Sequence, residues 1–146
     1  MKRVLAVVAI FAVALAAPAT VEGKKKKPVK VTLSSWQVVL NDNGHPIDAA
    51  NKSTYTYCPT DGVTHIYAIG TGKPAKKGKG FSVTWKLDGS KIVTLHYKTL
   101  KGGKVLAPLN RNGVPLDDGT YTAVKKNGKK TSSIVITLKG DRSACG

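Results

Sequence analysis

Short runs of alternating or β-branched residues, separated by Gly, Asn, Asp and Pro, fill the chain from residue 31 onward. A period of two places one set of side chains on the buried face of a strand. No window of this part has the apolar spacing of an amphipathic helix. Evenly spaced runs with turn residues between them predict an all-β sandwich or barrel. The expected strands cover residues 31–41, 63–70, 80–87, 91–100, 104–109, 120–126 and 129–139, with a shorter one over 54–58.

The runs over 80–87 and 91–100 predict a hairpin. A two-residue loop at 88–89 would set the apolar residues of the two strands on opposite faces of the sheet. A three-residue loop over 87–89, with Gly89 left-handed, would pair Val83 with Val93 and Phe81 with Leu95. We therefore expect the longer loop.

A second hairpin is predicted around Asn127-Gly128, the favoured dipeptide of a type I′ turn. This turn would place Tyr121 opposite Ile134 and Ala123 opposite Ser132.

Residues 1–19 have the features of a cleaved secretory signal. Lys2 and Arg3 form a charged start, and an apolar stretch over residues 4–17 follows. This stretch is shorter than the ~20 residues that a helix needs to cross a bilayer. Small residues at 14–16 and 17–19 offer cleavage sites. We therefore expect a secreted or otherwise extracytoplasmic protein, with no transmembrane segment in the mature chain.

A basic stretch over residues 20–30 follows the signal. It contains Lys24, Lys25, Lys26 and Lys27 and has little to bury. Such composition favours a flexible arm. The length of the remaining chain favours one domain, over residues 31–146.

Two aromatic positions carry a resemblance to a known fold. Tyr121 follows an acidic residue by four positions and Gly119 by two, within the run Pro115-Leu116-Asp117-Asp118-Gly119-Thr120-Tyr121, and Trp85 lies in the middle of an upstream strand. This pattern resembles the tyrosine corner and the strand-C tryptophan of immunoglobulin-like domains. It is most similar to the Ig-like modules of secreted bacterial proteins.

The resemblance covers about residues 63–139 and implies an Ig-like antiparallel β-sandwich of about seven strands. Ala123 stands where antibody domains have the strand-F cysteine, so their intersheet disulfide is absent. An ordinary turn followed by a β-favouring aromatic residue is the alternative interpretation.

Cys58 and Cys145 are the two cysteines of the chain. Export makes a disulfide the default for such a pair. The Ig-like arrangement implies that the start of strand B and the end of strand G lie at the same end of the sandwich, which is compatible with this bridge. A bridge between chains, or a free Cys145, is the alternative.

The charge of the chain is strongly positive, with 24 Lys and Arg against 8 Asp and Glu and a formal net charge of +16. Nearly all of these cations are lysines. Lysine is a flexible, strongly hydrated point charge, so its clusters favour diffuse, salt-sensitive attraction to polyanions. The alternative is that the lysines keep a β-rich exported protein soluble and protect its sheet edges.

The Ig-like arrangement also implies that the B–C loop, the F–G turn and the basic arm meet at one end. We therefore predict a polyanion-binding end, with an anionic polymer or envelope component as partner. The loops lack interleaved aromatic residues, which disfavours base stacking of single-stranded nucleic acid. The candidate residues are Lys24, Lys25, Lys26, Lys27, Lys73, Lys76, Lys77, Lys79, Lys125, Lys126, Lys129 and Lys130.

Patterns of catalysis or metal binding are weak. The stretch 72–80 differs from a phosphate-binding loop in its glycine spacing and leads into a strand. His45, His65 and His96 lack the spacing of metal ligands. We expect no catalytic residue, no metal site, no cofactor and no small-molecule substrate.

The leading hypothesis is a secreted, non-enzymatic module that binds anionic polymers or a cell surface through its lysine-rich end. A protein-interaction or adhesin domain that binds through a sheet face is the second hypothesis. A small hydrolase or inhibitor is the third, and it would need a pocket with convergent polar groups.

Overall fold

The computed structural model describes residues 29–40, 47–48, 53–73 and 80–146, with the backbone alone at 47, 48 and 101. These residues form two β-sheets and contain no α-helix. The expected signal over 1–19, most of the basic arm, Lys24 to Lys27, and the loop lysines Lys76, Lys77 and Lys79 lie outside the described residues. No helix in the described part is long and apolar enough to cross a bilayer.

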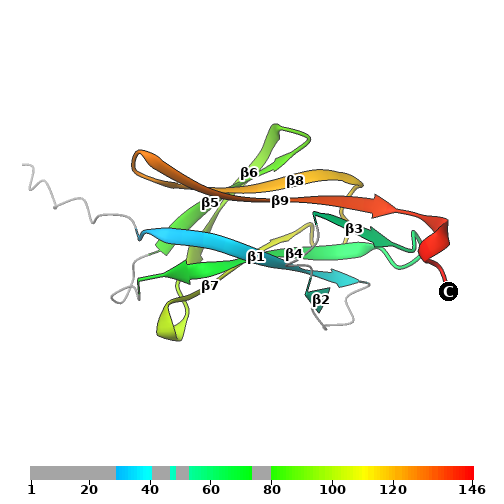
Figure 1. Cartoon of the computed structure of the whole chain (residues 1–146), viewed down its shortest axis with the longest axis horizontal. Helices are drawn as coiled ribbons and strands as arrows, with labels where there is room; N and C mark the ends of the chain where they lie inside the picture. Colours follow the sequence, from blue (N-terminus) through cyan, green and yellow to red (C-terminus); the bar gives the residue numbers. More distant parts are fainter. Residues whose placement is uncertain (1–28, 41–46, 49–52, 74–79) are drawn as a thin grey trace, which may run out of the picture.

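The first sheet has four antiparallel strands in the order β2-β1-β4-β7 (Figure 1). Its members are β1 (Val31–Leu40), β2 (Ile47–Asp48), β4 (Val63–Gly72) and β7 (Lys104–Asn110).

The second sheet has five strands in the order β3-β9-β8-β5-β6, in which β3 runs parallel to β9 and the other pairs are antiparallel. Its members are β3 (Thr54–Tyr57), β5 (Gly80–Leu87), β6 (Ser90–Lys98), β8 (Gly119–Asn127) and β9 (Lys130–Gly140). Two short 3-10 turns, η1 (Lys101–Gly103) and η2 (Arg142–Ala144), complete the described elements.

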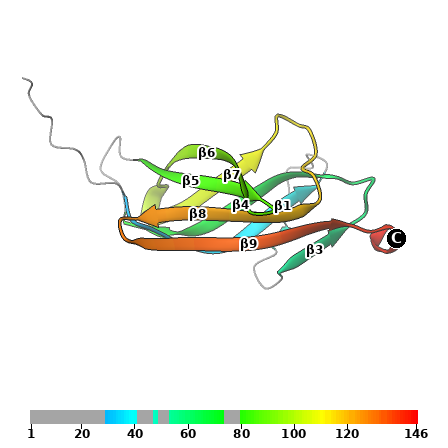
Figure 2. The ribbon, with the colours of Figure 1, turned by 90° about the horizontal axis from the view of Figure 1, so that it is seen from above.

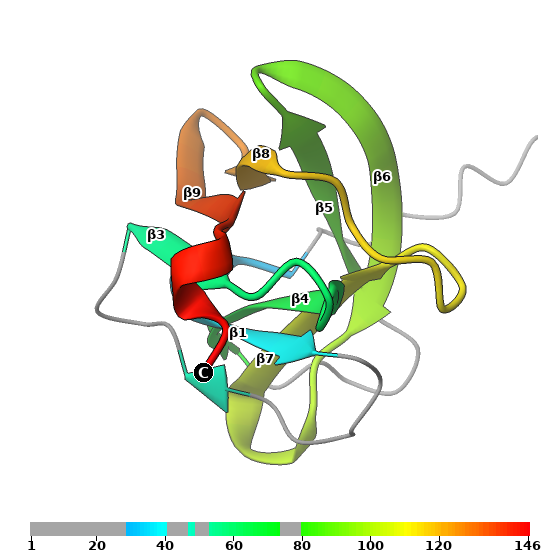
Figure 3. The ribbon, with the colours of Figure 1, turned by 90° about the vertical axis from the view of Figure 1, so that its right-hand side faces the viewer.

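The two sheets face each other across one hydrophobic core (Figure 3). Trp85 and Tyr121 of the second sheet are buried in this core, as are Ile66 and Val105 of the first sheet. The all-β, two-sheet prediction is therefore confirmed. The described strands outnumber the seven or so expected, because β2 was not foreseen and the short run over Thr54–Tyr57 does form a strand.

Trp85 begins a chain of hydrogen bonds that crosses from one sheet to the other. Its indole Nε1 donates to Tyr97 Oη at 3.1 Å, and Tyr97 Oη donates to the Pro108 carbonyl at 2.7 Å. The donor of the buried indole is thereby satisfied, as a buried Trp requires. This contact joins β5 and β6 to β7.

Tyr121 is hydrogen-bonded to the backbone of the turn that precedes it. Its Oη donates to the carbonyl of Asp117, four residues earlier, at 2.9 Å. The ring is buried, with 2% of its surface exposed. Burial raises the pKa of Tyr121 to about 12. The phenol thus fixes the turn that leads into β8.

The predicted disulfide is present within the chain. Cys58, after β3, bonds to Cys145, after η2, with 4.8 Å between their Cα atoms and a sequence separation of 87. Beside it, Tyr57 Oη donates to Asp118 Oδ1 at 2.6 Å. These contacts define what we call the disulfide end of the sandwich.

The predicted loop of the β5–β6 hairpin is wrong. The loop has two residues, Asp88 and Gly89, both with positive φ (48° and 81°) as in a type I′ turn, and Val83 pairs with Leu95. A bulge at Ile92 inserts one extra residue into β6. Because of this bulge, the apolar residues of β6 lie on the same face as those of β5. The longer loop was expected to have this effect.

The predicted register of the β8–β9 hairpin is also wrong, by two residues. Asn127 pairs with Lys130, so the loop is Gly128-Lys129, and Tyr121 lies opposite Ile136. Gly128 has a positive φ of 69°, as the first loop position of a type II′ turn requires. A shift of two leaves every side chain on its expected face. Asn127 stays in the strand because its side chain bonds to β1.

The domain begins slightly earlier than the predicted boundary. Val29 was assigned to the basic arm, but its side chain is buried against the core, while Lys30 is exposed.

Candidate functional site

Strand pairing places several segments at the end of the sandwich opposite the disulfide. Val31, at the start of β1, pairs with Gly72 at the end of β4, and Thr71 pairs with Lys104 at the start of β7. In the second sheet, Gly80 at the start of β5 pairs with Lys98 at the end of β6. We call this the basic end. It lies at the same end of the long axis as the tip of the β8–β9 hairpin, away from the C-terminus (Figure 2).

Asn127 joins the tip of the β8–β9 hairpin to the first sheet. Its Nδ2 donates to the Val31 carbonyl at 2.7 Å, and its Oδ1 accepts from the Val31 N–H at 3.0 Å. Ser132 Oγ accepts from the Leu33 N–H at 2.8 Å. The lysine-bearing hairpin is therefore held against the strand that the basic arm enters.

The described candidate lysines all lie at the basic end, although they come from two separate segments. Lys73 follows β4, and Lys126, Lys129 and Lys130 surround the hairpin loop; all four side chains are exposed. Among the described residues, none of them has an ion-pair partner. Their charges are therefore available to solvent or to a ligand.

Lys125 differs from the other candidates. It alternates with Tyr121 and Ala123 on the inward face of β8, and 4% of its surface is exposed. Its Nζ donates to the Lys126 carbonyl at 2.6 Å. Burial lowers the pKa of this ammonium. Lys125 therefore belongs to the interior side of the basic end and not to its outer surface.

The sequence interpretation missed three exposed lysines at this end: Lys30, Lys98 and Lys104. Lys98 and Lys104 lie on either side of the β6–β7 connection, where the Leu100 N–H donates to the Lys104 carbonyl at 2.8 Å. Their position could have been predicted from the expected strands over 91–100 and 104–109, since the connection between these strands, β6 and β7, lies at this end.

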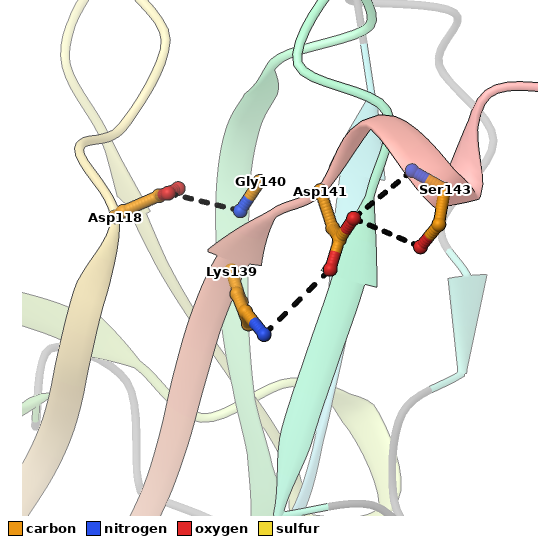
Figure 4. Close-up of polar contacts among 5 residues, drawn as sticks. All are labelled: Asp118, Lys139, Gly140, Asp141 and Ser143. Atoms are coloured by element: carbon orange, nitrogen blue, oxygen red, sulfur yellow. Dashed lines mark hydrogen bonds and ion pairs between the residues drawn. The ribbon is translucent and has the colours of Figure 1, made fainter.

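The described carboxylates gather toward the disulfide end. Asp118 accepts from Gly140 N–H at 2.9 Å, and Asp141 accepts from the N–H and Oγ of Ser143 at 2.9 and 2.8 Å (Figure 4). The bonds from Ser143, with a smaller contribution from Lys139, lower the pKa of Asp141. Among the described residues, carboxylates therefore lie toward the disulfide end, whereas the lysines of the basic end have no carboxylate partner.

Other carboxylates at this end are engaged with neighbours. Asp117 Oδ2 lies 2.5 Å from Arg111 Nη1, and Asp88 Oδ1 accepts from the Thr120 N–H at 2.9 Å. The ion pairs among described residues, Arg111–Asp117 and Lys139–Asp141, are therefore both away from the basic end.

Metal and catalytic chemistry find little support in the described residues. They contain no group of three or more His, Cys, Asp and Glu side chains placed to hold a metal ion. Ser82 Oγ and His96 Nδ1 are 2.7 Å apart, but they form an exposed cross-strand pair. None of the other described residues that line their groove carries a carboxylate. A nucleophilic triad would need a third group to orient the histidine.

No protein-family model and no curated protein sequence matches this chain.

Proposed function

We propose that this protein is a secreted, non-enzymatic module that binds anionic polymers through its basic end. The observation that carries the proposal is the meeting of Lys73 with the β8–β9 hairpin lysines at one end, without carboxylate partners among the described residues. A cluster of unpaired cations creates a potential that attracts polyanions and releases their counterions on binding. Phosphate-rich and sulfated polymers of a cell envelope or matrix are the polyanions that we propose as its partners.

The immunoglobulin-like character of the fold is part of the same proposal. The strand orders β1-β4-β7 and β9-β8-β5-β6 correspond to A-B-E and G-F-C-C′ in that family. The Tyr121 contact to the Asp117 carbonyl and the buried Trp85 of β5 support this interpretation. The parallel pairing of β3 with β9 is an addition to the constant-type pattern.

Export is supported by the intrachain disulfide, since such bonds persist in oxidising compartments. The signal-like residues 1–19 agree with it. Secretion therefore places the basic end where it meets envelope or matrix polymers.

Binding through a sheet face is the less favoured alternative. The outer face of the second sheet carries hydroxyl pairs, Thr84 with Thr94 and Thr120 with Thr137, each 3.0 Å apart. Val135 is exposed on the same face. Isolated exposed apolar residues are ordinary on a protein surface, so the described residues of this face give no specific argument for binding there.

Retention on a heparin column tests the proposal. The triple variant Lys73→Gln, Lys129→Gln, Lys130→Gln removes three cations from the basic end. The control variant Lys91→Gln, Lys139→Gln, Arg142→Gln removes three exposed cations outside it. We expect the first variant to elute at clearly lower salt than the control, although their net charges are equal. Equal elution of the two would contradict the proposal.

A further inference from the structure

A groove opens between β5 and β8 on the side of the basic end. The two strands pair only from Thr84 to Leu87 and from Tyr121 to Val124. Beyond these residues β5 continues to Gly80 and β8 to Asn127 without pairing to each other. The resulting cavity has a volume of about 480 Å³. Its lining residues are Gly80, Phe81, Ser82, Thr84, His96, Val124, Lys125 and Lys126.

Lys125 gives this groove a cation that the described residues satisfy with one hydrogen bond. An ammonium has three donors, and the acceptor that Lys125 has among the described residues is the Lys126 carbonyl, at 2.6 Å. This carbonyl belongs to the part of β8 beyond the last pair with β5. A buried charge is costly unless an opposite charge or several hydrogen bonds compensate it. An anion bound in the groove would supply both an opposite charge and additional hydrogen-bond acceptors.

The remaining polar groups of the groove suit an anion with several oxygens. Ser82 and Thr84 of β5 contribute hydroxyls to the lining. The Ser82 hydroxyl lies 2.7 Å from His96 Nδ1, and the Thr84 hydroxyl lies 3.0 Å from Thr94 Oγ1. Lys126 adds a second ammonium at the rim, and none of the described lining residues carries a carboxylate. Hydrogen bonds to a charged acceptor are stronger than neutral ones. The groove thus combines positive charge and hydroxyls in a concave site of the size of small-ligand pockets.

We propose that the β5–β8 groove binds one oxyanion, a phosphate or sulfate group, with Lys125 as its principal cation. The inference rests on the proposed function, since the group would normally be one unit of the polymer that the exposed lysines attract. The exposed lysines would then supply long-range attraction, and the groove would supply a discrete contact to one charged group.

Titration of the whole disulfide-bonded protein with inorganic phosphate, inorganic sulfate and a sulfated disaccharide, followed by NMR, tests this inference. We expect saturable shifts in the signals of Ser82, Thr84 and His96 for at least one of the three probes. Saturation with the inorganic ions assigns the site to the free ion as well as to the polymer group, and saturation with the disaccharide alone assigns it to the polymer. Absence of saturable shifts with all three would overturn the inference.

Variants separate the groove from the surface charge. Lys125→Met removes the buried ammonium, and Lys130→Met is the matched control, because it removes an exposed lysine of the same end that does not line the groove. We expect affinity for the probe to fall about tenfold or more in Lys125→Met and to change little in the control. Unchanged affinity in a folded Lys125→Met protein would overturn the inference. His96→Gln, at an exposed position, gives a second test that does not alter the interior: we expect weakened probe binding, and unchanged binding would count against the groove.

The failure of each proposal is recognised separately. Lys73→Gln, Lys129→Gln, Lys130→Gln should elute from heparin at lower salt than the control variant but keep the NMR response to the small probe. Heparin retention without a small-probe response supports the surface lysines and refutes the groove. The reverse result supports the groove and refutes the proposed role of the surface lysines.

Discussion

The side-chain amide of Asn127 bonds to both backbone groups of Val31, donating to its carbonyl at 2.7 Å and accepting from its N–H at 3.0 Å. These two residues are 96 positions apart and belong to different sheets. The contact fixes the β8–β9 hairpin against β1 at the basic end. It explains why the turn forms one residue later than the Asn-Gly dipeptide alone favours.

Replacing Asn127 with Ala should loosen this connection. The substitution leaves two backbone groups of Val31 without their partner, so we expect a loss of about 1–3 kcal/mol in the free energy of unfolding. Urea unfolding measures the loss, and hydrogen exchange should show faster exchange at the Val31 amide. Ser133→Ala, on the exposed face of β9, is the control and should change stability by less than about 0.5 kcal/mol. Equal stability of the two variants would show that the amide contact contributes nothing.

Opening the disulfide should lower stability without affecting the basic end directly. Closing a loop of 87 residues restricts the unfolded chain by up to about 4–5 kcal/mol in the chain-entropy model. We expect the urea midpoint to fall strongly under reducing conditions. Where the reduced protein is still folded, its heparin retention should match that of the oxidised protein, because Cys58 and Cys145 lie at the opposite end. Loss of retention in folded, reduced protein would show that the two ends are coupled.

Alkaline pH should destabilise the fold through its buried phenols. Burial raises the pKa of Tyr97 and Tyr121 to about 12, above the ordinary value of 10.0. As pH rises above 10, the unfolded chain loses these protons first, so the free energy of unfolding falls until pH reaches the folded pKa. For Tyr121 the full effect is about 2–3 kcal/mol.

Chemical unfolding at a series of pH values between 10.5 and 12 measures this fall. Tyr121→Phe should be less stable than the wild type at neutral pH by about 1 kcal/mol, because it loses the bond to the Asp117 carbonyl. Its further loss at high pH should be smaller, because one titrating phenol is gone. If the free energy of unfolding depended on pH equally in wild type and variant, the effect could not be assigned to the Tyr121 phenol.

The extra backbone residue at Ile92 should contribute more to stability than the Ile92 side chain does. Ile92 is 46% exposed, so Ile92→Lys should change stability by less than about 0.5 kcal/mol. Deleting the residue should instead turn Val93, Leu95 and Tyr97 to the opposite face of the sheet, because removal of one residue inverts a strand. We expect the deletion variant to unfold or to lose the near-ultraviolet signal of its packed aromatic side chains. A deletion variant as stable as the wild type would refute the role of the bulge.

The sequence predicted the strands and the two-sheet class well, because alternation and turn residues are local signals. The default pairing of Cys58 with Cys145 within the chain is confirmed, and the Tyr121 bond to the Asp117 carbonyl agrees with the tyrosine corner that the resemblance implied. The sequence did not predict the two hairpin registers. The β5–β6 bulge and the position of Asn127 depend on packing against other strands, and such long-range contacts override the preferences of a dipeptide.

The candidate site was predicted in part. The pairing of Val31 with Gly72, and the contact of Val31 with Asn127, bring Lys73 and the hairpin lysines to one end as expected. The inward position of Lys125 was missed, although its alternation with Tyr121 and Ala123 indicates it. The groove itself could not be foreseen, because it depends on where β5 and β8 stop pairing, which no local pattern specifies.

Binding to the basic end should depend strongly on salt. Each lysine that contacts a polyanion lets counterions leave, so the logarithm of the affinity should fall linearly with the logarithm of salt concentration. We expect the triple variant at Lys73, Lys129 and Lys130 to have a slope shallower by up to about 1 for each lysine in contact. Affinity measurements at several NaCl concentrations give the slope. Equal slopes for this variant and wild type would mean that these lysines do not contact the ligand.

The most direct measurement is an NMR map of the amide signals perturbed by a heparin oligosaccharide on the disulfide-bonded protein. We expect perturbations to concentrate on Lys30, Lys73, Gly128 and Lys129, with little change at Asp88, Gly140 and Ser143. Perturbations that concentrate on the disulfide end, or that spread evenly over the surface, would contradict the assignment of binding to the basic end.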